Sequence, residues 1–303
     1  MGIDIHTLNF LRYVKKKKIF GATATLGKQE LHIKHDQLKS LIKKDCEYLN
    51  KDPSEMEKSD YADHLLNFLF LSSKVDSFDF STYENANKIY NLNEPIKNEL
   101  LMNHYDTVID VGTSQYIFDI KNLYKNIINL TKVGGQIIHV LPANNFCGFG
   151  FFQFSPEFYL SLYSEKNGFI NTEIFIAELT NLRSWFKVKK FDDHEIRQTI
   201  SDKPAYVLVR TEKMNNDQEF KNIIYRDYSR DSKKLKDQNF DYEKHSFMGK
   251  VKNIIKRSNF FYAFYSKINF IYRKIFSTNH LNARNEWLEE INIEKILKNG
   301  KKI

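Results

Sequence analysis

The sequence predicts an α/β protein with a Rossmann-like open sheet of about seven strands, mostly parallel with the last strand antiparallel, and with helices on both faces. Short apolar and β-branched runs alternate with segments of helical periodicity, which is the pattern of β-α-β units. Glycine and polar residues follow several of these runs, as in the turns that end parallel strands. A polar stretch and a basic, aromatic segment follow the last predicted strand. We therefore expect a sheet domain with a C-terminal helical tail.

The segment 105–157 is the centre of this prediction. It begins with the strand-like run YDTVIDVG, continues through a helical segment to Gly134 and Gly135, and then enters the apolar run QIIHVLP and an aromatic loop. Such a unit places two parallel strands in one sheet. Ligands of these sheets bind outside the carboxyl ends of the strands, so the polar residues after each strand are the candidate site residues. His139, inside the second run, is predicted to be a buried, hydrogen-bonded histidine.

Similar apolar runs predict the remaining strands, over 20–29, 75–79, 87–91, 172–179 and 205–211. Helices are predicted over 6–18 and 61–70, and from a Ser155 cap with Pro156 at the first position to Gly168. The chain then divides into a Rossmann-like domain at 1–212, a polar linker at 213–243 and a basic, aromatic, helical tail at 244–303.

The net charge of +8 is concentrated in the tail. Between Lys244 and Arg284 the chain carries nine basic residues and no acidic residue. The rest of the chain is therefore close to neutral, which argues against nucleic acid as a partner. The apolar stripe within 250–276 has two functional interpretations, contact with an anionic membrane surface or with a protein partner. A helix folded back onto the core is the structural alternative.

Cysteine content and the absence of long apolar runs indicate the cellular compartment in which we expect the protein. Two cysteines, Cys46 and Cys147, argue against a disulfide framework and for a reducing environment, and neither has the neighbours of a zinc motif. The first residues hold no apolar run of signal-peptide length, and the chain has no window of 18 uninterrupted apolar residues. We expect a cytoplasmic protein without a bound metal, either soluble or peripheral at the inner membrane surface.

Asp79 closes the predicted second strand. An acidic residue at this place in dinucleotide-binding folds accepts hydrogen bonds from the ribose hydroxyls of the ligand. Ser81 and Thr82 follow it, so a helix-capping role is the alternative. The sequence contains no G-x-G-x-x-G or G-x-x-x-x-G-K-[ST] run, which argues against dinucleotides and nucleoside triphosphates as ligands.

Four segments are specific enough to compare with known families. They are Leu26-Gly27-Lys28-Gln29, Asn91-Leu92-Asn93, the segment GTSQYIF at 112–118 and the segment GFGFFQFSPE at 148–157. Over residues 8–212 the chain resembles the class I S-adenosylmethionine-dependent methyltransferases, and among them a bacterial methyltransferase-like group linked with surface-glycan gene clusters. The last segment is the most specific of the four.

The resemblance implies S-adenosylmethionine as the cofactor and assigns its parts to residues after the strands. Gly27 and Gln29 are expected to hold the methionine part through backbone amides, and Asp79 the ribose. Asn91 and Asn93 are expected to meet the adenine edge, with ordinary turn chemistry before Pro95 as the alternative.

The resemblance also implies residues near the transferred methyl group and its acceptor. Asp110 and Gly112 follow the central strand beside the expected point of transfer. Tyr116 is expected to bind or deprotonate the acceptor, or else to form a wall of the pocket, since an ordinary phenol is a poor base at neutral pH. Asn145 lies in the loop after the next strand, where a neutral amide can orient a sugar hydroxyl. The phenylalanines of that loop suit a lid, or a cover for the sheet edge.

Several positions depart from the family pattern. Thr25 stands where an acid is usual, Gln29 where a second glycine is usual, Gln115-Tyr116 in place of a Glu-His pair, and Phe149 in place of a loop histidine. Two functions therefore stand side by side. The first is methyl transfer from S-adenosylmethionine to an oxygen or nitrogen of a sugar or glycan precursor. The second is a catalytically inactive methyltransferase-like protein that binds or scaffolds in glycan assembly. A different nucleotide-using Rossmann enzyme is the third interpretation.

Overall fold

The structure is a computed structural model that describes residues 2–189, 201–216, 223 and 287–298. All of these residues belong to one compact unit, formed by 1–223 together with 281–303. The segment 250–276, for which a membrane or protein contact is expected, lies outside the described residues.

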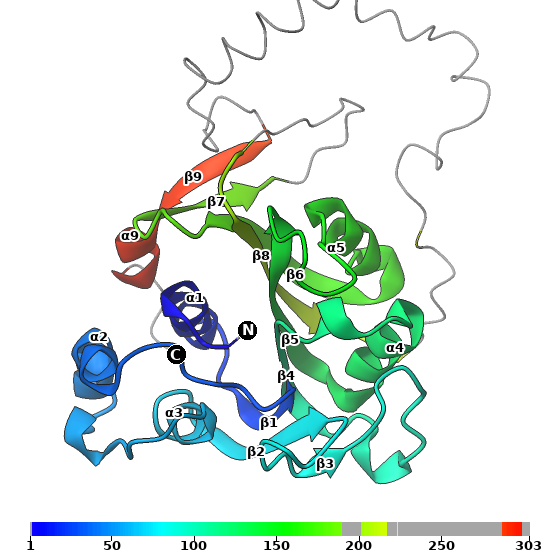
Figure 1. The fold of residues 1–303 in the computed structure, drawn as a ribbon, viewed down its shortest axis with the longest axis horizontal. Helices are drawn as coiled ribbons and strands as arrows, with labels where there is room; N and C mark the ends of the chain where they lie inside the picture. Colours follow the sequence, from blue (N-terminus) through cyan, green and yellow to red (C-terminus); the bar gives the residue numbers. More distant parts are fainter. Residues whose placement is uncertain (1, 190–200, 217–222, 224–286, 299–303) are drawn as a thin grey trace, which may run out of the picture. The chain divides into compact units, whose positions relative to one another are not determined.

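One nine-stranded sheet runs through the described residues, in the order β3-β2-β1-β4-β5-β8-β6-β7-β9 (Figure 1). The strands are β1 (Gly21–Leu26), β2 (Ser72–Asp79), β3 (Lys88–Ile89), β4 (Tyr105–Val111), β5 (Thr131–Asn144), β6 (Phe169–Glu178), β7 (Ser184–Val188), β8 (Ala205–Lys213) and β9 (Leu288–Asn292). Strands β1 to β5 pair in parallel. Strand β8 lies antiparallel between β5 and β6. The predicted open sheet, mostly parallel with its last predicted strand antiparallel, is therefore confirmed.

Two strands at one edge of the sheet were not predicted. Strand β7 pairs antiparallel with β6, and β9 pairs antiparallel with β7, with Phe186 opposite Glu290. The tail prediction for 244–303 is therefore wrong for its last part, because residues 288–298 return to the sheet domain. The linker boundary at 213 is also wrong by one residue, since Lys213 is the last residue of β8 and is 2% exposed.

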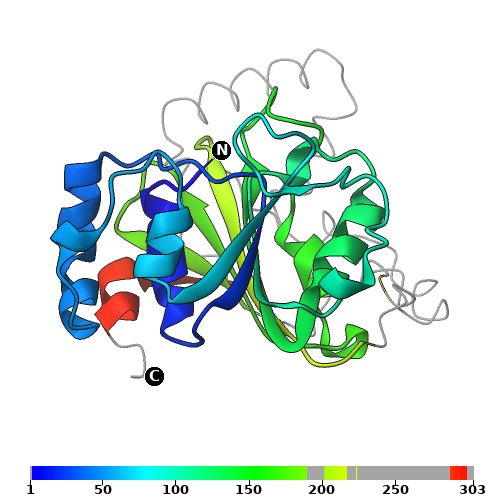
Figure 2. The same cartoon turned by 90° about the horizontal axis from the view of Figure 1, so that it is seen from below.

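Helices cover both faces of the sheet, as predicted. They are α1 (Ile5–Lys15), α2 (His35–Tyr48), α3 (Asp63–Phe68), α4 (Ile120–Leu130), α5 (Pro156–Leu162) and α9 (Ile293–Lys298). Figure 2 shows the blue helices and the red α9 on one side of the sheet and the green helices α4 and α5 on the other. Among the described helices, none is long and apolar enough to cross a bilayer.

The two faces have separate cores because side chains alternate along each strand. In β4, Val108 joins the core under α4 and α5, whereas Ile109 joins the core under α1, α2 and α3. In β5, Ile137 and Ile138 divide in the same way. Strands that are buried on both faces read as continuous apolar runs, which is why these runs predict the central strands.

Helix α5 starts as predicted and ends early. The Ser155 side chain accepts a hydrogen bond from the Phe158 N–H, and Pro156 holds the first position. The helix ends at Leu162, and a separate short 3₁₀ turn, η4 (Glu165–Asn167), precedes Gly168. The single helix predicted up to Gly168 is therefore wrong. Gly168 instead closes η4 with a φ of 78°, a left-handed conformation that favours glycine.

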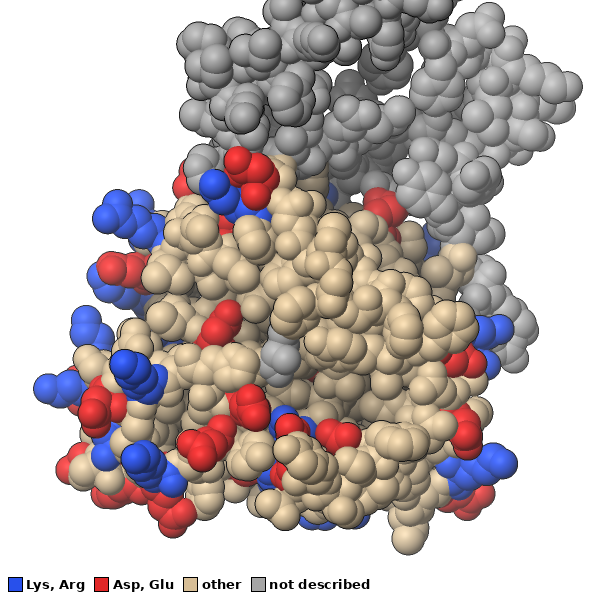
Figure 3. All heavy atoms as spheres, viewed as in Figure 1, with Lys and Arg blue, Asp and Glu red and all other residues tan. Residues whose placement is uncertain are grey.

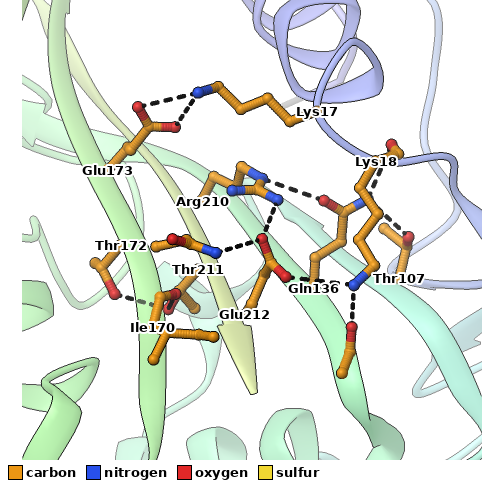
Figure 4. Close-up of polar contacts among 12 residues, drawn as sticks. Lys17, Lys18, Thr107, Gln136, Ile170, Thr172, Glu173, Arg210, Thr211 and Glu212 are labelled. Carbon is orange, nitrogen blue, oxygen red and sulfur yellow. Dashed lines mark hydrogen bonds and ion pairs between the residues drawn. The ribbon is translucent and has the colours of Figure 1, made fainter. Parts of the chain in front are cut away.

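A polar network at the amino ends of the central strands is shown in Figure 4. The Arg210 guanidinium is 3% exposed and donates from Nε to Gln136 Oε1 at 3.3 Å, while its Nη2 pairs with Glu212 at 2.5 Å. Lys17 Nζ pairs with Glu173 Oε2 at 3.1 Å. Each of these charges has a partner, and the contacts have a structural role: Arg210 joins β8 to β5, and Lys17 joins the segment after α1 to β6.

Candidate functional site

The sheet changes direction between β1 and β4. From β1 the chain adds β2 and β3 on one side, and then crosses to place β4 on the other side of β1. At such a switch point the loops diverge from the carboxyl ends of the strands and leave a crevice for a ligand.

A pocket of about 560 Å³ lies at this place. It is lined by Gly27, Lys28, Gln29, Glu30, Phe78, Asp79, Phe80, Glu84, Tyr90, Asn91, Leu92, Asn93, Thr113, Tyr116 and Ile117. The lining residues come from the turns that follow four different strands, β1, β2, β3 and β4. Among the predicted site residues, the pocket therefore brings together Gly27, Gln29, Asp79, Asn91, Asn93 and Tyr116.

Gly27 brings the turns after β1 and β4 into contact. Its φ is 73°, and its N–H donates to Phe78 O at 2.7 Å. A methyl group on Gly27 would lie 2.8 Å from Thr113 Oγ1, closer than carbon and oxygen can approach without a shift. Thr113 Oγ1 in turn donates to Leu26 O at 2.6 Å. Glycine is therefore required here both by the backbone conformation and by the lack of space.

Gln29 folds back onto the same turn. Its Nε2 donates to Leu26 O at 2.6 Å, and the side chain is buried. The backbone is fixed as well, because the Ala62 N–H donates to Gln29 O at 2.9 Å. The buried Gln29 Oε1 has no hydrogen-bond partner. The turn thus presents a side-chain amide to the pocket where the resembled family has a glycine.

Asp79 ends β2 and its carboxylate stands beside Gly27. The Oδ1 atom accepts a hydrogen bond from the Phe80 N–H at 2.7 Å. The Oδ2 atom lies 3.9 Å from the position that a Gly27 side-chain methyl would take. Residues 80–87 form turns and bends and no helix, so the capping alternative is not what the structure shows. The Oδ2 atom is placed to accept hydrogen bonds from a ligand in the pocket.

The asparagines after β3 are tied into their own turn. Asn91 Oδ1 accepts hydrogen bonds from the backbone and side-chain nitrogens of Asn93, each at 3.1 Å. Asn93 Oδ1 accepts from the Asp119 N–H at 3.0 Å, at the start of α4. Both residues line the pocket, and their side-chain bonds are also ordinary turn chemistry.

Acidic side chains dominate the charge of the pocket. Glu30, Asp79 and Glu84 line it together with one lysine, Lys28, whose ammonium pairs with Asp63 at 2.9 Å. Burial raises the pKa of Glu84, and the charges of Glu30 and Asp79 raise it further. In Figure 3 acidic side chains gather over α3, β1 and the neighbouring loops. This potential favours a cationic ligand over a phosphate.

Asp110 does not reach the pocket. Its side chain is fully buried, and its carboxylate accepts hydrogen bonds from Ser114 Oγ and, each at 3.2 Å, from the N–H groups of Thr113 and Ser114. His139 Nδ1 lies 2.8 Å from Asp110 Oδ2, which confirms that His139 is a buried, hydrogen-bonded histidine. Because these groups occupy the carboxylate, its placement corrects the expectation that Asp110 stands beside the transferred methyl group. It holds the turn after β4 instead.

Two further predicted residues also lie outside the lining of the pocket. Gly112 is buried, and its φ of 78° lets the chain turn from β4 toward Thr113. Asn145 is exposed in the loop after β5, with a φ of 57°, and its Nδ2 donates to Ser201 O at 3.3 Å. Asn145 therefore ties two loops together in this structure, and a role toward an acceptor stays a prediction.

The aromatic loop after β5 is divided between core and surface. Phe154 is buried, whereas Phe151 is 65% exposed and meets the exposed Phe118 edge to face at 5.7 Å. The Phe151 N–H donates to Gln115 O at 2.6 Å, which holds the loop against the turn that carries Tyr116. Tyr116 is half-exposed at the mouth of the pocket. Part of the predicted lid is thus a rim of exposed rings beside the pocket.

Three of the lining residues, Glu30, Tyr90 and Glu84, were not among the predicted site residues. Glu84 lies in an irregular loop between β2 and β3, and no local pattern could have brought it to the pocket. Within the described residues, no group of three metal-ligating side chains is close enough to hold an ion.

Comparisons with known proteins give similarity of structure alone. No protein-family model matches the sequence, and a search of curated proteins found no match. The solved structures similar to this chain include TehB from Haemophilus influenzae, with a TM-score of 0.31 and 17% identity over 50% of this chain and 54% of TehB. The match thus spans about half the length of TehB.

Two further similar structures come from Thermotoga maritima. One is an S-adenosylmethionine-dependent methyltransferase, with a TM-score of 0.33 and 18% identity over 68% of this chain and 88% of the other. The second is an S-adenosylmethionine-dependent O-methyltransferase, with a TM-score of 0.30 and 12% identity over 72% of this chain and 69% of the other. With TM-scores this low, the fold assignment rests on the strand order of this chain and the function on its pocket.

Proposed function

We propose that this protein binds S-adenosylmethionine in the pocket at the carboxyl ends of β1 to β4 and transfers its methyl group to an oxygen or nitrogen of a sugar or glycan precursor. The observation that carries the cofactor assignment is the meeting of three turns in one pocket, with Gly27 after β1, Asp79 at the end of β2, and Asn91 and Asn93 after β3. The sugar or glycan acceptor is drawn from the resemblance of the loop at 148–157.

The residues present fit the cofactor. Gly27 lets the turn after β1 approach Thr113 closely, as a side chain at this position would not, and the turn forms one wall of the pocket. Asp79 would accept the ribose hydroxyls, and Asn91 and Asn93 would lie along the adenine edge. The acidic lining suits a ligand that carries a sulfonium and an ammonium, and it disfavours the phosphates of other nucleotide ligands.

When bound, S-adenosylmethionine supplies an electrophilic methyl group. The residues of this chain contribute binding and orientation, because alignment of the acceptor with the methyl group provides much of the rate of such a displacement. The carboxylate of Asp110 is occupied by Ser114 and His139 and takes no proton from an acceptor. Tyr116 forms part of the wall at the mouth of the pocket. An acceptor that is itself readily deprotonated, or that needs no strong base, suits this arrangement.

A binding protein without catalysis is the second candidate function. Two observations favour it: Gln29 narrows the turn after β1, and the carboxylate of Asp110 is unavailable as a base. Such a protein would bind the cofactor and transfer no methyl group.

Calorimetric titration with S-adenosylmethionine and S-adenosylhomocysteine tests the proposal. We expect micromolar binding to the wild-type chain, and loss of binding in Asp79→Ala. Asp36→Ala, which removes an exposed acid on α2, is the matched control and should bind as the wild type does. Absence of binding at millimolar ligand, or unchanged binding in Asp79→Ala, would refute the cofactor site. Binding without methyl transfer to nucleotide sugars or glycan precursors would favour the second candidate.

A further inference from the structure

An aromatic rim stands at the mouth of the pocket, on the side of β4 and β5. It consists of three exposed rings, Tyr116, Phe118 and Phe151, of which Phe118 is 74% exposed. Tyr116 lines the pocket itself, and the Phe118 and Phe151 rings meet edge to face at 5.7 Å. The aromatic rim therefore begins at the wall of the pocket and continues outward along two segments, one after β4 and one after β5.

Backbone contacts hold the two segments of the aromatic rim together. The Phe151 N–H donates to Gln115 O at 2.6 Å, so the loop after β5 is bound to the turn after β4. Gly150 allows this approach, because its φ is 71° and a methyl group on it would lie 2.5 Å from Gln115 O. Within its own turn, the Tyr116 N–H donates to Thr113 O at 2.9 Å. The rings are thus carried in a fixed arrangement beside the pocket.

The segments that carry the aromatic rim are uncharged at the surface. Residues 111–118 and 133–156 contain no Asp, Glu, Lys or Arg. Two of their exposed polar side chains are bound within the protein, since Gln153 Oε1 accepts from the Phe146 N–H at 2.9 Å and Asn145 Nδ2 donates to Ser201 O at 3.3 Å. The rings are therefore the main surface that these segments offer to a ligand, and apolar contact is the interaction that they favour.

We propose that the aromatic rim binds an alkyl chain of the acceptor, so that the acceptor is an amphiphilic glycoside whose sugar reaches the pocket. The inference rests on the proposed function and names the kind of acceptor. The rings of Phe118 and Phe151 lie at 82° to each other, so they present no parallel pair of faces that could enclose a flat aryl group, whereas a flexible chain can follow both rings. Such a chain would cover apolar surface that is exposed to water.

Two other occupants fit these observations less well. An anionic membrane surface is recognised by lysine and arginine, which are absent from residues 111–118 and 133–156. A stable protein interface buries about 800 Å² on each partner, and three rings, which cover at most about 150 to 250 Å² each, supply less than this. A small amphiphile needs less surface, because its sugar would be held at the pocket as well.

Calorimetric titration of the chain saturated with S-adenosylhomocysteine tests the proposal with glucosides that differ only in the group joined to the sugar. Octyl β-D-glucoside, below its micellar concentration, should bind at least 10-fold more tightly than methyl β-D-glucoside and more tightly than phenyl β-D-glucoside. Phe118→Ser and Phe151→Ser should each weaken binding of the octyl glucoside about 5-fold to 30-fold and leave S-adenosylhomocysteine within about twofold. Phe151→Leu keeps an apolar side chain and should stay within about threefold of the wild type. Leu100→Ser, at an 83% exposed leucine in the short 3₁₀ turn before β4, is the matched control and should leave binding of both ligands unchanged.

Several outcomes would overturn the proposal. Equal binding of the octyl and methyl glucosides, or an equal loss in Leu100→Ser, would remove the alkyl chain as the occupant while the cofactor site stood. Tightest binding of the phenyl glucoside would assign the aromatic rim to an aryl group instead. Phe118→Ser should sediment with vesicles of phosphatidylcholine and phosphatidylserine to the same extent as the wild type, and a selective loss would assign the rim to a membrane. If S-adenosylhomocysteine itself does not bind at millimolar concentration, the proposed function falls and the rim loses its assignment to an acceptor.

Discussion

His139 Nδ1 lies 2.8 Å from Asp110 Oδ2, and both side chains are fully buried on paired positions of β4 and β5. On the other side of the ring, His139 Nε2 lies 2.7 Å from the Tyr163 hydroxyl. Asp110 also holds the N–H groups of Thr113 and Ser114. A buried carboxylate is stable only when it is paired and hydrogen-bonded, so His139 supports the turn that carries Thr113 to the pocket.

Removal of the histidine is expected to be costly. His139→Phe leaves the Asp110 carboxylate buried without one of its hydrogen-bond partners, so the free energy of unfolding should fall by about 1 to 3 kcal/mol. Urea denaturation at pH 7 measures the loss. His64→Phe, at a histidine whose side chain is 51% exposed, is the control and should change stability by less than about 0.5 kcal/mol. A loss under about 1 kcal/mol for His139→Phe would contradict the structural role of the pair.

Gly27 and Gly134 allow steric crowding to be separated from backbone strain. Their φ values are 73° and 78°, but a methyl group on Gly27 would meet Thr113 Oγ1 at 2.8 Å, whereas one on Gly134 would meet nothing within 4 Å. Both alanine variants carry the cost of a left-handed residue, about 1 kcal/mol. We expect Gly27→Ala to cost about 1 to 2 kcal/mol more and to weaken binding of S-adenosylhomocysteine at least 10-fold. Equal thermal shifts and equal binding in the two variants would show that the contact with Thr113 is unimportant.

The strands of the sheet could be predicted where burial on both faces gives them a continuous apolar sequence. Strands β4 and β5 are buried on both faces and read as apolar runs, so their positions follow from composition alone. Strand β9 has the sequence LEEIN, with glutamates on an edge of the sheet, and only its pairing with β7 makes it a strand. No local signal marks such a strand, because the partner is about 100 residues away in the sequence.

The candidate site could be predicted in part, for a related reason. Ligands of parallel sheets bind at the carboxyl ends of the strands, so the residues in the turns after the strands were predicted as site residues. Gly27, Asp79 and Asn91 lie in or at the start of such turns and line the pocket. A position in such a turn does not tell which way a side chain points. Asp110 lies on the same edge of the sheet, yet it turns inward to His139 because the register of β4 and β5 places the two residues opposite each other. Glu84 lines the pocket from an irregular loop, and the path of that loop is set by tertiary contacts and not by any local sequence pattern.

Buried tyrosines predict a loss of stability in alkali. Tyr124 and Tyr159 are joined by their hydroxyls at 2.8 Å, and burial raises the pKa of both well above the usual value. A raised folded pKa means that the stability is fully present below the unfolded pKa, near 10, and is lost as the pH rises above it. Between pH 9 and 11, the free energy of unfolding should fall less in Tyr159→Phe than in the wild type. The difference between the two falls should reach about 1 kcal/mol at pH 11. Tyr83→Phe, at an 89% exposed ring, should leave the fall unchanged, and a reduction of the fall as large as that of Tyr159→Phe would contradict burial as the cause.

Lys213 predicts a pH dependence of the opposite sign. Its ammonium is buried at the end of β8 and donates to Asn103 Oδ1, Ile128 O and Thr131 O, each at 2.8 Å, and burial lowers the pKa of Lys213 to about 8. Between pH 8 and the unfolded pKa near 10.5, the unfolded lysine holds a proton that the folded one releases, so this residue makes the free energy of unfolding rise with pH.

The comparison of wild type with Lys213→Met isolates this effect, because the tyrosines contribute equally to both chains. The stability advantage of the wild type should grow between pH 7 and 10, by up to about 3 kcal/mol. Lys74→Met, at a lysine whose side chain is 57% exposed, serves as the control and should show a difference that stays constant over the same range. Urea denaturation at four pH values decides the matter. A constant difference between wild type and Lys213→Met would mean that the buried ammonium keeps its proton in this range, with the three oxygens compensating fully for its burial.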